Sequence, residues 1–262
     1  MEDNKIRIDT LIVNKNILQS RAKAQAAIEK GLVKVNGKTV KKPSEKYSEF
    51  AEIDLMGQPY KYVSRAGEKL DKALCNFGIS LLAKRCLDVG ASTGGFTHCM
   101  LSHGARSVHA VDVGTSQLDL SLFKDKRVFS FENTDIRSFI SDKPFDFIAA
   151  DVSFISLKLI SDALLRLSGS KTEIVVLVKP QFECGGEGIS KNGVVSDKKV
   201  HCRVINDMIA HFAEKKFTVR GLDYSPIRGG EGNIEFLLYL DFSGRHAHTD
   251  VERIVDIAHK MG

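Results

Sequence analysis

The chain has 262 residues, of which 43% are hydrophobic and 27% are charged, and its formal net charge is +5. This ordinary globular composition excludes a mainly disordered or collagen-like chain, and the length suits one large domain with or without a small one. No apolar stretch approaches the roughly 18 residues of a membrane-spanning helix, and residues 1–10 lack the apolar core of a signal peptide. We therefore expect nothing to direct the chain into or across a membrane.

Five cysteines lie at positions 75, 86, 99, 184 and 202, and no two of them form a CxxC pair. An odd number without paired spacing argues against a disulfide framework and against a zinc site, so we predict no metal site. Reduced thiols that serve as small apolar residues are typical of a cytoplasmic protein, which is the localisation we expect.

Positive charge is concentrated at the start of the chain. Residues 1–46 contain 11 Lys and Arg against 5 Asp and Glu, whereas residues 47–262 contain 27 against 28. A basic unit joined to a nearly neutral body favours a polyanion as the partner. Nucleic acid is the preferred interpretation, and a solvated lysine-rich face is the alternative.

Local patterns in this basic segment predict a small helix and hairpin module. Ser20 is a good N-cap for a helix over residues 21–30, and Gly31 is a natural stop. Asn36-Gly37 between alternating apolar residues predicts a tight hairpin, since both turn positions require positive φ. The basic side chains available to phosphates are Arg7, Arg21, Lys23, Lys34, Lys38, Lys41 and Lys42.

The module resembles the alpha-L RNA-binding motif of ribosomal proteins. The residues that carry the resemblance are Arg7-Ile8-Asp9, Ser20-Arg21, Gly31, Val33, Val35-Asn36-Gly37 and Pro43-Ser44. It implies a folded RNA as the partner, recognised through backbone and shape more than through base edges. We place this small α+β domain, with its linker, at residues 1–60.

Residues 61–262 alternate between predicted strands and helices, after a last strand and linker over residues 47–61. Helices are expected over residues 65–77, 94–103, 155–167 and 197–215. Strands are expected over residues 85–89, 108–113, 127–131, 145–151, 173–179, 217–222 and 235–240. This alternation predicts an α/β fold with a Rossmann-like, mostly parallel seven-stranded sheet and helices on both faces.

A glycine-rich loop follows the first of these strands and opens a helix. Glycines there let a ligand approach the backbone, and Asp112, at the end of the next strand, is placed to bind a ribose diol. The spacing is not the G-x-G-x-x-G of dinucleotide sites, and Asp88 suits an ammonium but opposes a pyrophosphate. S-adenosylmethionine is therefore favoured over a dinucleotide and over a loop that only makes a tight turn. The predicted cofactor residues are Asp88, Gly90, Ala91, Ser92, Thr93, Gly94, Gly95, Phe96, Asp112 and Asp135.

Polar side chains follow two other predicted strands. Asp151 and Lys179 would both emerge at the carboxyl edge of the sheet, where open α/β sheets bind ligands. Glu235 begins a late strand after the glycine-rich residues 229–232. Each of the three also has a plain interpretation as a solvated charge at a strand end.

The C-terminal domain resembles the FtsJ-type ribose 2′-O-methyltransferases. Residues 64–70 are similar to that family's SRxxxKL opening, and Lys69, Asp151, Lys179 and Glu235 occur in the order of its K-D-K-E tetrad. The combination of this domain with the N-terminal module resembles the TlyA family of rRNA cytidine 2′-O-methyltransferases, a family often labelled hemolysins. The segments most similar to that family are residues 151–156 and 178–183. The resemblance implies S-adenosylmethionine as the cofactor and ribosomal RNA or ribosomal subunits as the partner. Arg65, in the SRxxxKL segment, joins the candidate RNA contacts.

Such a tetrad implies methyl transfer to a ribose 2′-hydroxyl, with Lys179 as the proton acceptor. A free lysine has a pKa of about 10.4, so a lysine base needs a neighbouring cation that favours its neutral form, and Lys69 is expected to supply it. Asp151 would orient Lys179 and the methyl group. Glu235 would hold either Lys69 or the hydroxyl in place.

The target base is expected to leave its helix to reach the pocket. Phe96, Phe154 and Phe182 are candidates to stack on it or on adenine, with core packing as the other interpretation. A non-enzymatic RNA-binding factor remains an alternative if the pocket is vestigial. A membrane-active hemolysin would need a membrane-inserting segment or an export signal, and the sequence shows no such segment. An amino-methyltransferase would need an Asn/Asp-Pro-Pro-aromatic loop, which the sequence also lacks.

Overall fold

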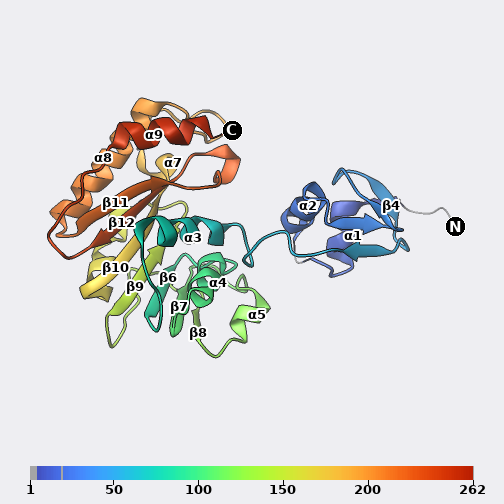
Figure 1. Cartoon of the computed structure of the whole chain (residues 1–262), viewed down its shortest axis with the longest axis horizontal. Coiled ribbons are helices and arrows are strands. Elements are labelled where there is room, and N and C mark those ends of the chain that lie inside the picture. Colours follow the sequence, from blue (N-terminus) through green and yellow to red (C-terminus); the bar gives the residue numbers. More distant parts are fainter. Residues whose placement is uncertain (1–4, 19, 262) are drawn as a thin grey trace. The chain divides into compact units, whose positions relative to one another are not determined.

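The computed structural model describes residues 5–18 and 20–261, and the chain divides into two compact units (Figure 1). The units are Met1–Ser64 and Arg65–Gly262. Residues of each unit form a hydrophobic core of their own, as expected for separate domains.

The N-terminal unit combines two helices with two small sheets. Its elements are β1 (Lys5–Arg7), α1 (Ile8–Asn14), α2 (Arg21–Glu29), β2 (Val33–Val35), β3 (Lys38–Thr39), β4 (Lys46–Ser48) and β5 (Ile53–Leu55). Strands β1 and β4 pair with each other, and the second sheet has the order β3-β2-β5. Ser20 caps α2 by accepting a hydrogen bond from the backbone N–H of Lys23. Asn36 and Gly37 both have positive φ, so the predicted helix and hairpin are confirmed.

The C-terminal unit is built on a seven-stranded sheet with the order β11-β12-β10-β9-β6-β7-β8. The strands are β6 (Arg85–Val89), β7 (Ser107–Val111), β8 (Val128–Phe131), β9 (Phe145–Ala150), β10 (Ser168–Val178), β11 (Thr218–Tyr224) and β12 (Phe236–Asp241). Neighbours from β10 to β8 are parallel, while β12 is antiparallel to both β10 and β11. The predicted fold class is confirmed.

Helices cover both faces of this sheet (Figure 1). They are α3 (Ala66–Phe77), α4 (Gly95–Ser102), α5 (Leu120–Phe123), α6 (Ser161–Leu167), α7 (Pro180–Glu183), α8 (Lys198–Glu214) and α9 (Val251–Lys260), with the 3-10 turns η1 (Leu157–Leu159) and η2 (Gly230–Gly232). In β6, Leu87 and Val89 join the core that α6, α8 and α9 complete, while Asp88 contacts Thr97 of α4. Alternate strand side chains thus face opposite helix layers. Over residues 5–18 and 20–261, no helix combines the length and the apolar composition needed to cross a bilayer.

The antiparallel strand β12 begins where its parallel neighbours end. Phe236, which opens β12, pairs with Val178, which closes β10. The adjoining residues, Glu235 and Lys179, therefore leave the sheet at the same edge. Asp151 reaches this edge from the end of β9, the next strand along.

Several elements differ from the sequence predictions, which name neither α5 nor α7. The helix expected over residues 155–167 begins as the separate turn η1, and β10 extends back to Ser168 with a register shift before Glu173. The prediction also omits α9, whose buried residues Val251, Val255 and Ala258 have helical spacing. That pattern follows a polar loop and covers little more than two turns, which makes it a weak signal in sequence alone.

Candidate active site

The loop between β6 and α4 lies against the end of β9. Gly90 has φ +81°, and a Cβ atom there would lie 2.6 Å from the carbonyl oxygen of Asp151. Gly94, with φ +91°, is the residue before α4, and a Cβ there would lie 2.7 Å from Leu118 Cδ1. Both positions favour glycine for conformation, and Gly90 also needs it for space, which keeps the loop close to the backbone of Asp151 at the end of β9.

A cavity of about 380 Å³ opens beside this loop, at the carboxyl edge of the sheet. Its volume lies in the usual range of small-molecule sites, roughly 300–1,000 Å³. The predicted cofactor residues Gly90, Ser92, Asp112 and Asp135 line it, together with Asp151. The other predicted cofactor residues lie outside its described lining: Asp88, Ala91, Thr93, Gly94, Gly95 and Phe96.

Asp88 is fully buried beneath the loop. Its Oδ2 accepts a hydrogen bond from Thr97 Oγ1 at 2.6 Å, and its Oδ1 has no hydrogen-bond partner among the described residues. Burial raises the pKa of this carboxyl to about 7, although the bond from Thr97 acts in the opposite direction. Because the side chain contacts Thr97 of α4 and lies outside the described lining of the cavity, the position favours bracing of the loop over the ligand contact that we expected.

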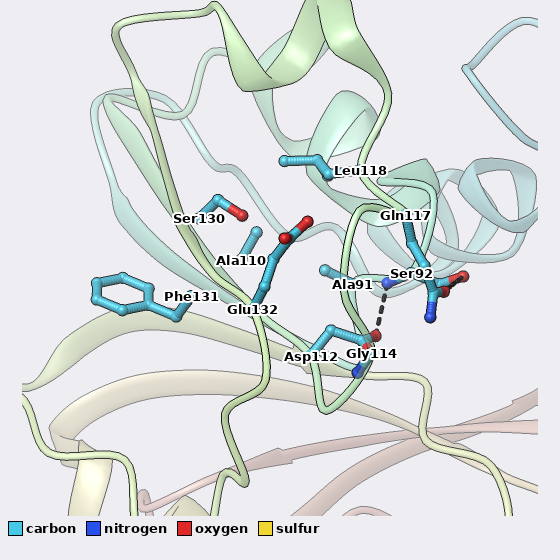
Figure 2. Close-up of a pocket in the computed structure, with 10 residues that line it drawn as sticks. All are labelled: Ala91, Ser92, Ala110, Asp112, Gly114, Gln117, Leu118, Ser130, Phe131 and Glu132. Carbon is cyan, nitrogen blue, oxygen red and sulfur yellow. Dashed lines mark hydrogen bonds between the residues drawn. The ribbon is translucent and has the colours of Figure 1, made fainter.

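Two backbone N–H groups fix the carboxylate of Asp112 (Figure 2). Oδ2 accepts from the N–H of Ser92 and Oδ1 from that of Gly114, each at 2.7 Å. The hollow drawn in Figure 2 is a separate, small one of about 10 Å³, room for about one water molecule. Ligand-sized space therefore lies on the side of the larger cavity. A carboxylate has about four acceptor sites, so Asp112 retains capacity for a ligand hydroxyl.

Asp135 lines the cavity from the segment that follows β8. Arg137 Nε donates to both carboxylate oxygens at 3.0 Å, and these hydrogen bonds are the main reason that the pKa of Asp135 is lowered. The carboxylate is thus ionised at neutral pH and available as an acceptor on the cavity wall.

Four charged residues meet at the edge where β9, β10 and β12 come together. Lys69 Nζ lies 2.7 Å from Glu235 Oε2 and 3.4 Å from Asp151 Oδ2. Lys179 Nζ lies 2.5 Å from Asp151 Oδ1. Lys69, Lys179 and Glu235 are buried, and Asp151 belongs to the cavity wall. The structure therefore brings the four residues predicted as a tetrad into one continuous ion-pair network.

Two positive and two negative side chains balance in this network. Burial opposes the charge of Lys69, but Asp151 and Glu235 outweigh it and raise the pKa of Lys69. Burial also opposes ionisation of Asp151, and the two lysines reverse that effect and lower its pKa. Lys69 is thus a cation held between two carboxylates. The repulsion of Lys179 by Lys69 that we expected is countered by Asp151, which contacts both lysines.

Ser153 and Glu183 are not among the predicted site residues. Lys179 Nζ donates a hydrogen bond to Ser153 Oγ at 2.9 Å. Glu183 of α7 accepts one from Ser156 Oγ at 2.5 Å and so ties α7 to the segment that follows Asp151. A hydroxyl two residues after Asp151 is visible in the sequence, but its lysine partner is 26 residues away and only the fold brings them together.

Phe154 lies on the cavity wall with its side chain 92% exposed. Its φ of +63° is rare for a bulky residue and marks a strained backbone. Its ring centroid lies 5.3 Å from that of Phe182. Core packing is therefore the wrong interpretation for Phe154, whereas it is confirmed for Phe96, which is 3% exposed.

Two of the predicted RNA-contacting arginines share one buried carboxylate in the N-terminal unit. Asp9 accepts hydrogen bonds from Arg7 Nη2 at 2.9 Å, Arg21 Nη2 at 2.8 Å and Gln25 Nε2 at 2.9 Å. The bonds from Arg7 are the main cause that holds the pKa of Asp9 well below its ordinary value, against its burial. Of the other predicted RNA contacts, Lys38, Lys41, Lys42 and Arg65 are exposed, and Lys23 and Lys34 are half-buried.

The sheet order, the glycine-rich loop and the polar cluster at the sheet edge together define a methyltransferase domain, joined to a small basic domain. Residues 62–242 match the family described as FtsJ-like methyltransferase, and residues 6–53 match the S4 domain. The chain therefore belongs to the FtsJ-like methyltransferase family, within the group of two-domain proteins that includes TlyA.

Relatives match this chain over nearly its whole length. It is 42% identical to YqxC of Bacillus subtilis, provisionally named an rRNA methyltransferase, over 99% of this chain and 96% of that protein. It is 37% identical to the 16S/23S rRNA (cytidine-2′-O)-methyltransferase TlyA of Mycobacterium tuberculosis, over 89% of each. A solved structure from Streptococcus thermophilus, labelled a hemolysin, superimposes with a TM-score of 0.77 at 41% identity, covering 98% of this chain and 97% of the other.

Proposed function

We propose that this protein transfers the methyl group of S-adenosylmethionine to the ribose 2′-hydroxyl of a cytidine in ribosomal RNA. The observation that carries the proposal is the ion-pair network of Lys69, Asp151, Lys179 and Glu235 at the wall of a ligand-sized cavity. The FtsJ-like family match and the name of the TlyA relative support it. We propose rRNA or ribosomal subunits as the partner and, with them, the cytoplasm as the compartment.

The cavity wall suits S-adenosylmethionine better than a dinucleotide. Its described lining includes the aspartates 112, 135 and 151 and no lysine or arginine, so it favours a cationic ligand and opposes a pyrophosphate. When bound, S-adenosylmethionine supplies an activated methyl group on a positively charged sulfur. Asp112 offers acceptor sites to a ribose diol, and the bare backbone at Gly90 lets a ligand lie against both loop and strand.

Lys179 is the proposed acceptor of the hydroxyl proton, after the proton of its own ammonium group has passed to solvent. Contacts with Asp151 and Ser153, which both line the cavity, fix the position of its amino group. A fixed acceptor removes much of the orientational cost of proton transfer. Lys69 keeps Asp151 ionised, and Glu235 anchors Lys69, so these two residues act on the reaction through Asp151 and Lys179.

Phe154 is the proposed stacking surface for the target base. A base that leaves its helix loses the stacking energy of its neighbours, and stacking on an exposed aromatic ring restores about 1–3 kcal/mol of that energy. Phe154 offers such a ring on the wall that also holds Asp151 and Ser153. Arg7, Arg21 and the exposed lysines of the N-terminal unit would hold the RNA backbone through its phosphates.

Mass mapping of ribose methylation tests this function. Purified protein, S-adenosylmethionine and undermethylated ribosomal subunits should yield a 2′-O-methylcytidine that is absent without the protein. Lys179→Ala should abolish this product and leave cofactor affinity, measured by calorimetry, nearly unchanged. Near-normal turnover in that variant would refute the role of Lys179. RNA binding without methylation by the unmodified chain would instead favour a non-enzymatic binding factor.

A further inference from the structure

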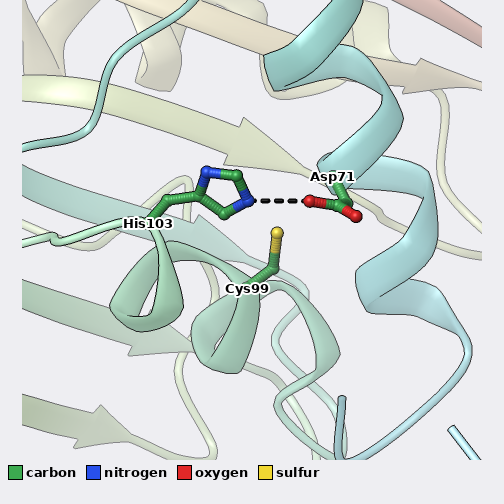
Figure 3. Close-up of side chains that lie close together, drawn as sticks. All are labelled: Asp71, Cys99 and His103. Atoms are coloured by element: carbon green, nitrogen blue, oxygen red, sulfur yellow. Dashed lines mark hydrogen bonds and ion pairs between the residues drawn. The ribbon is translucent and has the colours of Figure 1, made fainter. Parts of the chain in front are cut away.

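A second cluster of reactive side chains lies between α3 and α4, outside the described lining of the cavity (Figure 3). Asp71 belongs to α3, Cys99 to α4, and His103 follows α4 one helical turn after Cys99. One ligand atom from each residue lies within 4.8 Å of the other two. His103 Nε2 lies 2.7 Å from Asp71 Oδ1.

We propose that Asp71, Cys99 and His103 form a zinc-binding site. A thiolate, an imidazole and a carboxylate are three of the ligand types that Zn²⁺ binds. The sulfur ligand disfavours Mg²⁺ and Ca²⁺, which take oxygen ligands. Three protein ligands leave the fourth tetrahedral position to a water molecule.

The geometry requires only small local shifts in the cluster. With zinc–ligand bonds of about 2.0–2.3 Å, neighbouring tetrahedral ligands lie about 3.3–3.6 Å apart. Atoms that are now up to 4.8 Å apart would approach by roughly 1 Å, and His103 Nε2 and Asp71 Oδ1, now 2.7 Å apart, would separate by about 0.6 Å. Residues four apart on a helix share one face, so Cys99 and His103 both point to α3, which supplies Asp71. Asp71 and His103 are half-buried, which leaves a route from the surface to the buried Cys99.

Binding of Zn²⁺ releases the proton of the Cys99 thiol. Bonds form from zinc to Cys99 Sγ, to one nitrogen of His103 and to one oxygen of Asp71, and the proton of the Cys99 thiol passes to solvent. The hydrogen-bonded contact between His103 and Asp71 gives way to the two metal bonds. Occupancy would clamp α3, which carries Lys69, to α4, which the glycine-rich loop precedes.

This proposal departs from the sequence prediction of no metal site, and it does not depend on the proposed function. The sequence contains no CxxC pair, and the single cysteine and histidine of the cluster meet a carboxylate 28 residues before the cysteine. The plainer alternative is that the Asp71–His103 contact joins the two helices and that Cys99 packs as a small apolar residue.

Metal titration of the full chain, first treated with chelator, separates the two possibilities. Co²⁺ should produce the near-ultraviolet absorption of a thiolate–cobalt bond, one equivalent of Zn²⁺ should abolish it, and one proton should be released per metal ion. Cys99→Ser should remove the absorption and weaken Zn²⁺ binding at least about 100-fold, and His103→Gln and Asp71→Asn at least about 10-fold. Cys75→Ser is the matched control, since Cys75 is an exposed cysteine of α3 outside the cluster.

The proposal is overturned if the unmodified chain shows no such absorption, or if the absorption persists in Cys99→Ser; its loss in Cys75→Ser would then identify Cys75 as the ligand. If Cys99→Ser does not fold, as judged by circular dichroism, the Zn²⁺ affinities of the variants at the half-buried residues Asp71 and His103 test the site instead. Unchanged Zn²⁺ affinity in both His103→Gln and Asp71→Asn then contradicts the site.

Discussion

The backbone of Gly229 lies directly against the carboxylate of Glu235. A Cβ atom at position 229 would lie 2.5 Å from Glu235 Cδ and closer still to Oε1. Gly229 has φ −73°, a value that any residue adopts, so alanine fits the backbone conformation but would displace the carboxylate of Glu235. This glycine therefore determines where Glu235 meets Lys69.

Gly229→Ala is expected to lower the rate of methyl transfer on the order of 100-fold, because a shift of about 1 Å in a positioning group costs that much. The cofactor affinity should change little, since neither residue lines the cavity. Single-turnover kinetics and calorimetry measure the two quantities. Gly230→Ala is the matched control, because a Cβ at that position meets no atom within 4 Å. Equal rates in the two variants would contradict this role of Gly229.

Asp9→Asn is expected to weaken RNA binding even though it raises the net positive charge. The substitution releases Arg7 and Arg21 from their shared carboxylate, so both lose their fixed orientation toward phosphates. Affinity should fall on the order of 10-fold while the salt dependence stays close to that of the unmodified chain. If Arg21 contacts one phosphate, Arg21→Ala should instead make the slope of log binding constant against log salt concentration shallower by about 0.9.

Asp54→Asn is the control for this experiment. It changes the net charge equally, and Asp54 is an exposed residue of β5 in the same unit.

The pH of the comparison matters because Asp9 has a lowered pKa in the folded state. The contribution of Asp9 to folding stability is complete above the ordinary pKa of an aspartate and is lost as the pH falls below that value. Binding should therefore be compared at neutral pH. Tighter binding of both variants would show that net charge, and not arginine placement, governs affinity.

Phe154→Ala is expected to reduce kcat/KM for rRNA by about 10- to 100-fold, which corresponds to about 1–3 kcal/mol of lost base stacking. Phe154→Leu, which keeps apolar area but no aromatic face, should restore little of it. The affinity for S-adenosylmethionine should fall less, because the ring is almost fully exposed. Phe123→Ala, at an exposed phenylalanine of α5 outside the cavity wall, is the control. An equal loss in that variant would point to a general apolar effect.

The fold was predictable because its signals are local. The apolar runs before Gly90 and Asp151 and the glycine-rich loop each occupy fewer than about a dozen residues, and each is bounded by turn signals within the same stretch. The strand pattern placed Asp151 and Lys179 at one edge of the sheet, but Lys69 and Glu235 joined them only through a family resemblance. Lys69 and Asp151 are 82 residues apart, and no periodicity links them.

The contacts that the residue pattern does not predict without the family resemblance depend on tertiary register. Glu235 meets Lys69 because β12 runs antiparallel and so begins at the edge where β10 ends, a direction that the sequence pattern does not encode. Asp9 appears in the sequence as one acidic residue in a basic segment, yet it is the residue that two arginines share. Side-chain function in such cases follows from burial and pairing, which only the packed structure determines.

Asp88→Asn is expected to make folding stability less dependent on pH. The folded-state pKa of about 7 exceeds the ordinary value of 3.8, so between these values the folded chain keeps a proton that the unfolded chain has lost. Stability therefore decreases as the pH rises through this range, by an amount on the order of 4 kcal/mol at most. Asparagine stays neutral at every pH and can still accept the hydrogen bond from Thr97. The variant should consequently gain stability relative to the unmodified chain above pH 7 and match it more closely near pH 4.

Urea unfolding between pH 4 and pH 8 measures this difference. Asp207→Asn, at an exposed residue of α8, controls for the general effect of removing a negative charge. If the two variants follow the same pH profile, the buried carboxyl of Asp88 is not the group that titrates. If Asp88→Asn is instead less stable at every pH, the carboxylate contributes an interaction that its burial beside Thr97 does not explain. The pH profile thus separates the free-energy cost of burying a charged carboxylate at Asp88 from the stability that the contact of Asp88 with Thr97 gives to the loop.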